Sequence, residues 1–180
     1  MRDHLSQRRS GWARAGLAAL GGGLLLAACA TPSGPTHVLG ATETIRVLDA
    51  ELDFLALVDT GAHSTSIHAI DLRIAHASDA MAQNIGKPIV FRVANERGET
   101  REVRSTISAV VWVSTANGSE PRYRVPLRLR WQGVEKRIEV NLRDRRPLTY
   151  KLLIGRDWIQ GDFLVDVSRN VPVDAAAGPP

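Results

Sequence analysis

Apolar and polar positions alternate along much of residues 38–170, and this period of two predicts a domain built from β-strands. A continuous apolar run at residues 53–58 is bounded by turn-forming residues, as expected for a buried strand. Further strands are predicted within residues 37–48, 88–93, 100–107, 110–113, 123–131, 138–142 and 163–167.

Tight turns and very little helix complete this pattern. Turn signals lie at Asn95–Gly98, Asn117-Gly118 and Gln132-Gly133. Residues 69–82 have some helical character, and residues 156–160 predict a short helix that Gly161 ends. The expected fold class is therefore all-β: a small closed β barrel with one short C-terminal helix.

The first 28 residues have the pattern of an export signal. The segment before residue 15 is basic, because it contains four arginines and one aspartate. An apolar stretch follows at residues 15–28. That stretch is shorter than the roughly 20 residues that a membrane-spanning helix needs. Leu26-Ala27-Ala28-Cys29 resembles the lipobox of bacterial lipoproteins, which implies that Cys29 is lipidated and begins the mature protein. An ordinary signal peptide that happens to contain a cysteine is the alternative.

We therefore expect four segments: a signal peptide at residues 1–28, the lipidated cysteine and a Pro/Gly/Ser linker at 29–37, the domain at 38–170, and a disordered tail at 171–180. Cys29 is the only cysteine, so it has no disulfide partner within the chain. Lipidation would anchor the protein in the bacterial cell envelope, facing the periplasm. Ala30 favours the outer membrane, because an Asp at that position retains well-studied lipoproteins at the inner membrane.

The basic character of the chain does not indicate a nucleic-acid partner. Residues 1–28 carry a net charge of +3 out of the total of +4, which leaves +1 for the rest of the chain. No block of basic residues interleaved with aromatic ones is present in the sequence.

The candidate chemistry centres on Asp59-Thr60-Gly61-Ala62, which follows the buried strand predicted at residues 53–58. An aspartate with Thr-Gly behind it at the end of a strand is how aspartic peptidases place their catalytic carboxylate. The simpler alternative is a turn aspartate that caps a strand end. A second segment far downstream, Leu153-Ile154-Gly155-Arg156, is followed by the predicted short helix.

These two segments resemble, in the right order, the paired elements of retroviral-type aspartic peptidases, the retropepsins. In that fold the second segment threads through the loop made by the first. A closer resemblance is to the bacterial retropepsin-like group labelled "ATP-dependent zinc protease". The motifs that carry this resemblance are Ser66-Ile67-His68-Ala69, Leu142-Arg143-Asp144-Arg145, Leu153-Ile154-Gly155-Arg156 and Phe163-Leu164-Val165-Asp166. Leu57 departs from that group, in which a Lys often occupies this position.

The resemblance implies an aspartic endopeptidase that works as a homodimer, because one chain supplies only one Asp-Thr-Gly. The implied catalytic residues are Asp59, Thr60 and Gly61, with the Thr60 hydroxyl reaching the partner loop. The implied substrate-binding or supporting residues are Ala62, Ser66, His68, Asn117, Gly118, Ile154, Gly155 and Arg156. Asp144 and Arg145 are candidates for dimer contacts or substrate binding.

A flap that closes over substrate is also implied. We place it at residues 114–121 with its tip at Asn117-Gly118, and residues 95–98 are the rival position. The hairpin at 88–107 would then be an insertion. We expect Trp112, Trp131 and Trp158 in the core or at an interface.

The sequence supports neither the zinc nor the ATP of the group's label. His63 and His68 belong to no His-Glu-x-x-His motif, and no phosphate-binding Gly-x-x-x-x-Gly-Lys-Ser/Thr loop is present in the sequence. His37, His68 and His76 could gather around a metal, but no cysteine or spaced acidic ligand accompanies them. We therefore expect no metal and no cofactor.

Three functional hypotheses remain open. The first is an active endopeptidase that cleaves a peptide or protein substrate in the cell envelope. The second is a catalytically silent lipoprotein of the same fold that binds envelope proteins or peptides. The third is a hydrolase of envelope peptides or amino-acid conjugates.

Overall fold

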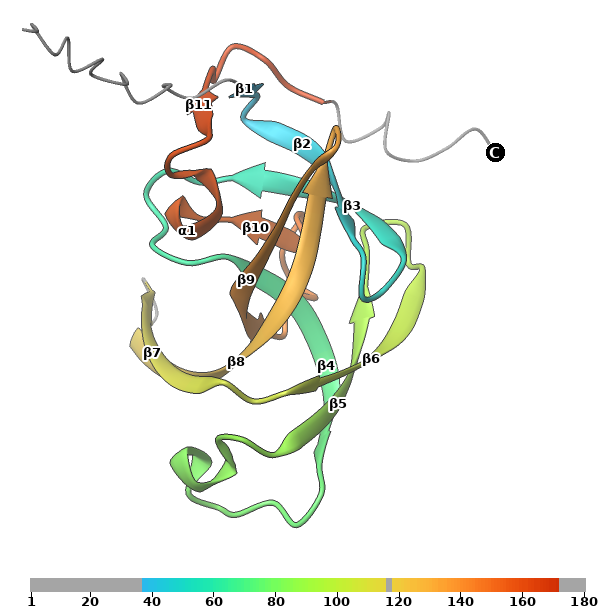
Figure 1. Cartoon of the computed structure of the whole chain (residues 1–180), viewed down its shortest axis with the longest axis vertical. Helices are drawn as coiled ribbons and strands as arrows, with labels where there is room; N and C mark the ends of the chain where they lie inside the picture. Colours follow the sequence, from blue (N-terminus) through green and yellow to red (C-terminus); the bar gives the residue numbers. More distant parts are fainter. Residues whose placement is uncertain (1–36, 116–117, 172–180) are drawn as a thin grey trace, which may run out of the picture. The chain divides into compact units, whose positions relative to one another are not determined.

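The computed structural model describes residues 37–115 and 118–171 (Figure 1). The expectations for the signal peptide, Cys29, most of the linker, Asn117 and the tail from residue 172 onward lie outside these residues. No helix in the described part of the chain is long and apolar enough to cross a membrane.

Strands dominate the described residues, which confirms the all-β expectation. The strands are β1 (His37–Leu39), β2 (Thr42–Val47), β3 (Leu52–Val58), β4 (Ser66–Ile74), β5 (Pro88–Ala94), β6 (Thr100–Thr106), β7 (Ala109–Thr115), β8 (Gly118–Trp131), β9 (Val134–Arg143), β10 (Leu152–Ile154) and β11 (Phe163–Val165). One short α-helix, α1 (Arg156–Ile159), lies between β10 and β11, and one 3-10 turn, η1 (Met81–Asn84), lies between β4 and β5.

The main sheet closes on itself. Paired strands follow one another from β10 to β3, β2, β8, β9 and β4, and β4 pairs with β10 again. The short strand β10 therefore completes a ring. Strands β5 and β6 extend the sheet beyond β4, β7 pairs with β8, and β1 pairs with β11 in a separate two-stranded sheet.

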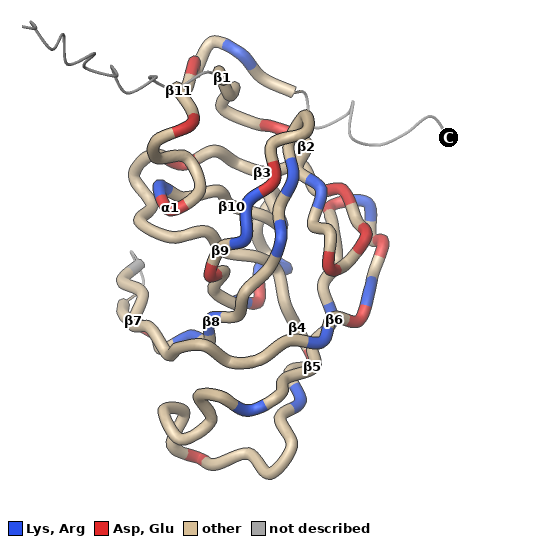
Figure 2. Tube along the Cα trace, viewed as in Figure 1, with Lys and Arg blue, Asp and Glu red and all other residues tan. Residues whose placement is uncertain are grey.

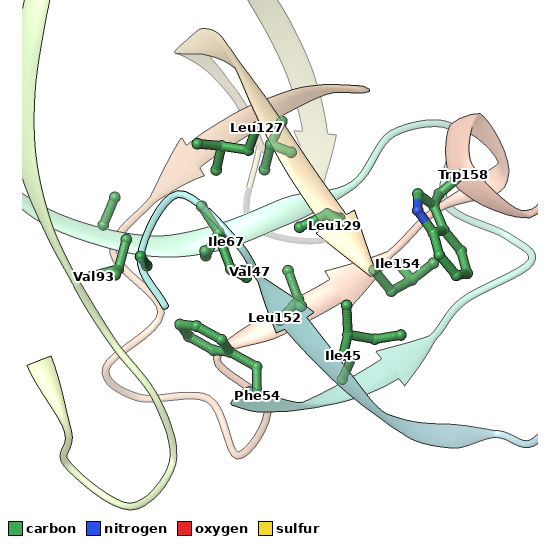
Figure 3. Packing of buried hydrophobic residues seen from close by; sticks show 14 of the residues in the cluster. Ile45, Val47, Phe54, Ile67, Val93, Leu127, Leu129, Leu152, Ile154 and Trp158 are labelled. Atoms are coloured by element: carbon green, nitrogen blue, oxygen red, sulfur yellow. The ribbon is translucent and has the colours of Figure 1, made fainter. Parts of the chain in front are cut away.

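The alternation along β8 shows why these residues form strands around a core. Val125, Leu127, Leu129 and Trp131 are buried, whereas Arg128 and Arg130 between them are exposed. The buried set joins apolar residues from β2, β3, β4, β10 and α1 in one cluster (Figure 3). Each fully buried Leu, Val or Phe stabilises the fold by about 1.5–3 kcal/mol.

The helical character expected for residues 69–82 is wrong. Strand β4 continues to Ile74, and only η1 makes a helical turn. Asp71 and His76 have φ angles of 54° and 51°, which a right-handed helix excludes. Strand β4 pairs with β5, β9 and β10, and these tertiary pairings override a weak local helix preference.

Candidate active site

Asp59 is the first residue after β3, and its own loop orients its carboxylate. The Asp59 N–H donates to the Ile154 carbonyl at 2.9 Å. Its Oδ1 accepts the Gly61 N–H at 2.9 Å and the Ala62 N–H at 3.1 Å. The hydrogen bonds that the Asp59 carboxylate accepts would also fit an aspartate that only stabilises a turn. The surrounding elements therefore decide between a turn aspartate and a catalytic one.

Strand β10 lies between the two strands that the Asp59 loop connects. It runs parallel to β3, with Leu153 opposite Leu57, and antiparallel to β4, with Leu153 opposite Ser66. Gly155 then passes so close to Ser64 that an added Cβ would lie 2.6 Å from the Ser64 carbonyl carbon. The downstream segment is thus inserted at the Asp59 loop, in the arrangement that the retropepsin resemblance implied.

Two charged residues at the start of α1 hold the Asp59 loop. Arg156 Nη1 donates to the carbonyls of Thr60 and Gly61, each at 3.0 Å. The Asp157 carboxylate accepts the Thr65 N–H at 3.0 and 2.9 Å and the Thr65 hydroxyl at 2.7 Å. Thr65 Oγ1 in turn accepts the Gly155 N–H at 3.1 Å. This network fixes both segments to one another around the carboxylate.

The sequence interpretation missed Thr65 and Asp157. Their contact spans 92 positions, so no local pattern announces it. The one available signal was an acidic side chain in the first turn of the predicted helix, where carboxylates are stabilised by free backbone N–H groups.

Asp59 lines a cleft of about 720 Å³. The other walls come from the loop after Asp59, from residues 111–114 of β7, and from four arginines of β8, β9 and the segment that follows β9: Arg122, Arg124, Arg143 and Arg145. Asp59 is the only acidic side chain among the residues that line this cleft. Figure 2 shows the basic positions along β8 and β9. Arginines therefore outnumber acidic side chains among the residues that line the cleft, although Glu120 and Asp157 pair with three of them from outside it.

The hairpin of β7 and β8 borders this cleft. Its strands pair from Ala109 opposite Arg124 to Thr115 opposite Gly118. Gly118 is the first residue of β8, and Asn117 of the predicted turn lies outside the described residues. Trp112 lines the cleft with 71% of its surface exposed, unlike Trp131 and Trp158, which lie in the core. The rival turn after Asn95 does not line the cleft. Asn95 is buried, and its side-chain amide donates to the Asp53 carbonyl at 3.0 Å.

Some of the remaining candidate residues line the cleft, and others are buried beneath the residues that line it. Gly61, Ala62 and Ser66 line the cleft, whereas His68 and Ile154 are buried behind it. Thr60 is exposed beside the carboxylate. The described residues contain no group of three or more His, Cys, Asp or Glu side chains placed to hold a metal ion.

His68 connects the cleft to the segment after β9. It is 2% exposed, and its Nδ1 accepts the Arg145 N–H at 3.0 Å. Burial lowers the pKa of His68 below its ordinary value, although the Asp144 carboxylate opposes this shift. Asp144 itself is held by Arg146, whose hydrogen bonds lower the pKa of Asp144 to about 2.

Fold and site together define a protein of the retropepsin-like aspartic peptidase class. A family model described as "Retropepsin-like aspartic endopeptidase RimB" matches residues 38–174, and the chain therefore belongs to the RimB-like family. The family places the chain with enzymes of hydrolase type.

The curated relatives carry a different name. Two proteins named "Probable alpha-L-glutamate ligase", from Shewanella pealeana and Shewanella halifaxensis, are each 28% identical over 120 residues. The match covers 64% of this chain, which spans about a quarter, 25%, of each of those relatives.

A solved structure supports the fold. The crystal structure of a protein of unknown function from Legionella pneumophila has a TM-score of 0.61 to this chain at 24% sequence identity. The similarity covers 77% of this chain and 98% of that protein.

Proposed function

We propose that this protein is an aspartic endopeptidase whose active site forms when Asp59 of two identical chains meet across a two-fold axis. The observation that carries the proposal is the Asp59 loop, with its oriented carboxylate and with β10 inserted behind it. One chain supplies one such carboxylate, and peptide hydrolysis by this route needs two.

The proposed chemistry follows from two carboxyl groups a few ångströms apart. They cannot both ionise readily, so the pair shares one proton. The ionised member takes a proton from a water molecule, which attacks the peptide carbonyl, and the protonated member serves as general acid toward the departing amine. Gly61 would let the two loops approach, and the Thr60 hydroxyl would bond to the partner loop.

The hairpin of β7 and β8 is the proposed flap. It already forms one wall of the cleft, and Trp112 exposes an apolar surface there that a bound peptide would cover. Closing this hairpin over substrate would exclude water from the carboxylate pair.

The preferred substrates are proposed to be acidic peptides. Four arginines line the cleft with the single Asp59 carboxylate, and among the described residues only two further carboxylates, Glu120 and Asp157, pair with them. The remaining positive charge would attract anionic chains. The names of the Shewanella relatives point in the same direction, because they refer to glutamate. Glutamate-rich peptides are therefore the first substrates to test.

We also propose that the enzyme is a lipoprotein of the bacterial cell envelope. The lipobox-like Leu26-Ala27-Ala28-Cys29 supports lipid attachment at Cys29, and the linker that follows would keep the domain near the membrane. The silent binding protein and the hydrolase of amino-acid conjugates are the other candidates. The intact Asp59-Thr60-Gly61 favours an active enzyme over a catalytically silent binding protein, since binding alone does not require that carboxylate.

Replacing Asp59 by Asn tests this function. The Asp59→Asn variant should lose peptidase activity on glutamate-rich peptides by at least about 100-fold, because it removes the general acid and base. Asp166→Asn is a matched control: Asp166 also follows a strand and holds a turn, through Ser168. Cleavage by Asp59→Asn at the wild-type rate would refute the mechanism.

A further inference from the structure

Arg145 is a buried cation that makes no ion pair with a carboxylate in the described part of the chain, although the Asp59 charge acts on it from a greater distance. The residue is 4% exposed and lines the cleft together with Asp59. Its Nε donates to the Tyr150 carbonyl at 3.0 Å, and neither Nη nitrogen has a hydrogen-bond acceptor among the described residues. Burial, together with the nearby Arg143 and Arg122 cations, lowers the pKa of Arg145 to about 10, so it stays charged at neutral pH.

The other three cleft arginines are already engaged. Arg122 donates to Glu120 at 2.8 Å and to the Asn141 side chain at 3.0 Å. Arg143 lies 3.4 Å from the same Glu120 carboxylate. Arg124 donates to the Glu139 carbonyl at 2.8 Å and lies 3.7 Å from Asp157. Arg145 alone combines burial, a place in the cleft wall and a free pair of Nη groups.

The backbone of Arg145 is fixed from both sides. Its N–H donates to His68 Nδ1 at 3.0 Å, and its carbonyl accepts the Leu148 N–H at 3.0 Å and Lys151 Nζ at 3.2 Å. The Nε bond to Tyr150 then sets the direction of the guanidinium. A side chain held in this way loses little conformational entropy when it binds a ligand.

Burying an isolated charge carries a large desolvation cost, which the attraction of a counter-charge offsets. Asp59 is the only carboxylate lining the cleft, and its charge favours the protonated form of Arg145. The planar guanidinium fork matches a carboxylate in a two-point contact. We infer that Arg145 binds a side-chain carboxylate of the substrate close to the scissile bond, and that His68 is the positioning residue that holds it there. This inference rests on the peptidase function proposed above.

Binding to an uncleaved acidic peptide tests the inference. The probe is a fluorescein-labelled hexaglutamate peptide with a blocked C-terminus, compared with a copy in which Gln replaces the two central Glu residues. All proteins carry Asp59→Asn, so affinity is measured without turnover. Adding Arg145→Met should weaken binding of hexaglutamate by about tenfold or more, with a smaller effect on the Gln-containing peptide. Arg145→Lys keeps the charge but not the planar guanidinium fork. Its affinity for hexaglutamate should lie between those of the proteins with Arg145 and with Met at this position.

The control variant is Arg101→Met, which removes the same charge from an exposed position on strand β6 and should leave both affinities unchanged. An equal loss for both peptides, no loss, or the same loss in Arg101→Met would overturn the inference. These outcomes are independent of whether Asp59→Asn abolishes cleavage, so this inference and the proposed function can fail separately.

Thermal stability separates a binding role from a structural one. Removing an unpaired buried cation should leave the melting temperature of Arg145→Met unchanged or higher, while affinity falls. A lower melting temperature together with equal loss for both peptides would assign Arg145 to the fold instead.

The positioning role of His68 has its own readout. His68→Leu removes the acceptor for the Arg145 N–H and should weaken hexaglutamate binding, whereas His68→Asn can present an amide oxygen near the position of Nδ1 and should restore most of it. Failure of His68→Asn to recover any affinity, in a protein that melts like wild type, would contradict this role.

Discussion

The imidazole of His68 is neutral in the folded protein for a clear physical reason. Burial is the largest cause of its lowered pKa, and the cations of Lys151 and Arg146 act in the same direction, while Asp144 opposes them. The Nδ1 atom must also stay unprotonated to accept the Arg145 N–H. Protonation of His68 is therefore disfavoured in the folded state relative to the unfolded chain.

The pH dependence of stability should show this. In the unfolded chain His68 takes up a proton near pH 6.5. In the folded protein the pKa of His68 is lower, so it takes up a proton only at a more acidic pH. The free energy of unfolding should thus decrease as the pH falls from 6.5 toward the folded-state pKa. Urea denaturation at several pH values from about 7.5 to about 5, which lie on both sides of the expected onset, measures this decrease.

His68→Asn provides the comparison, since it cannot titrate and should have a flatter slope over this range. The low pKa of Asp144, about 2, affects stability only at a more acidic pH, so the two contributions are separable. The same slope in wild type and His68→Asn would contradict this account of His68.

The elements around Asp59 show what could be predicted from the sequence. The Asp-Thr-Gly loop and the later Leu-Ile-Gly-Arg segment are local patterns. As predicted, the first follows a buried strand and the second precedes a short helix. The Asp157 contact to Thr65 depends on residues far apart in the chain, and only the folded arrangement brings them together. Strand β4 was mistaken in part for a helix because its pairing partners lie on β5, β9 and β10.

The two glycines of the site should respond differently to alanine. A Cβ at Gly155 would lie 2.6 to 2.9 Å from backbone atoms of Ser64, which cannot move without displacing the Asp59 loop. Gly155→Ala should therefore lower the free energy of unfolding by about 3 kcal/mol, the upper end of the usual cost of overpacking. Chemical denaturation measures this change.

Gly61→Ala is the matched substitution in the same site. Its Cβ would lie 3.1 Å from Asp59 Oδ1, a side-chain atom that can shift by a few tenths of an ångström. We expect a nearly normal free energy of unfolding but a loss of activity. Equal destabilisation by the two substitutions would show that the close passage of Gly155 does not hold the site together.

The whole domain encloses one core but presents only half of the proposed catalytic pair. The ring of strands closes within a single chain through β10, so folding needs no partner to complete the sheet. The positive cleft with its single acidic residue could not be predicted from the sequence, because the four arginines come from different segments and the net charge of the chain outside its first 28 residues is only +1. A second chain would supply the missing carboxylate.

Mixing active and inactive subunits tests that requirement most directly. Wild-type protein is combined with increasing amounts of Asp59→Asn under conditions that allow subunits to exchange, at constant total concentration, and cleavage of a glutamate-rich peptide is followed. If both chains supply Asp59, activity falls with the square of the wild-type fraction, to about one quarter at equal mixing, because mixed dimers are silent. A linear decrease, to about one half, would mean that a single chain carries a complete active site and would contradict the shared pair.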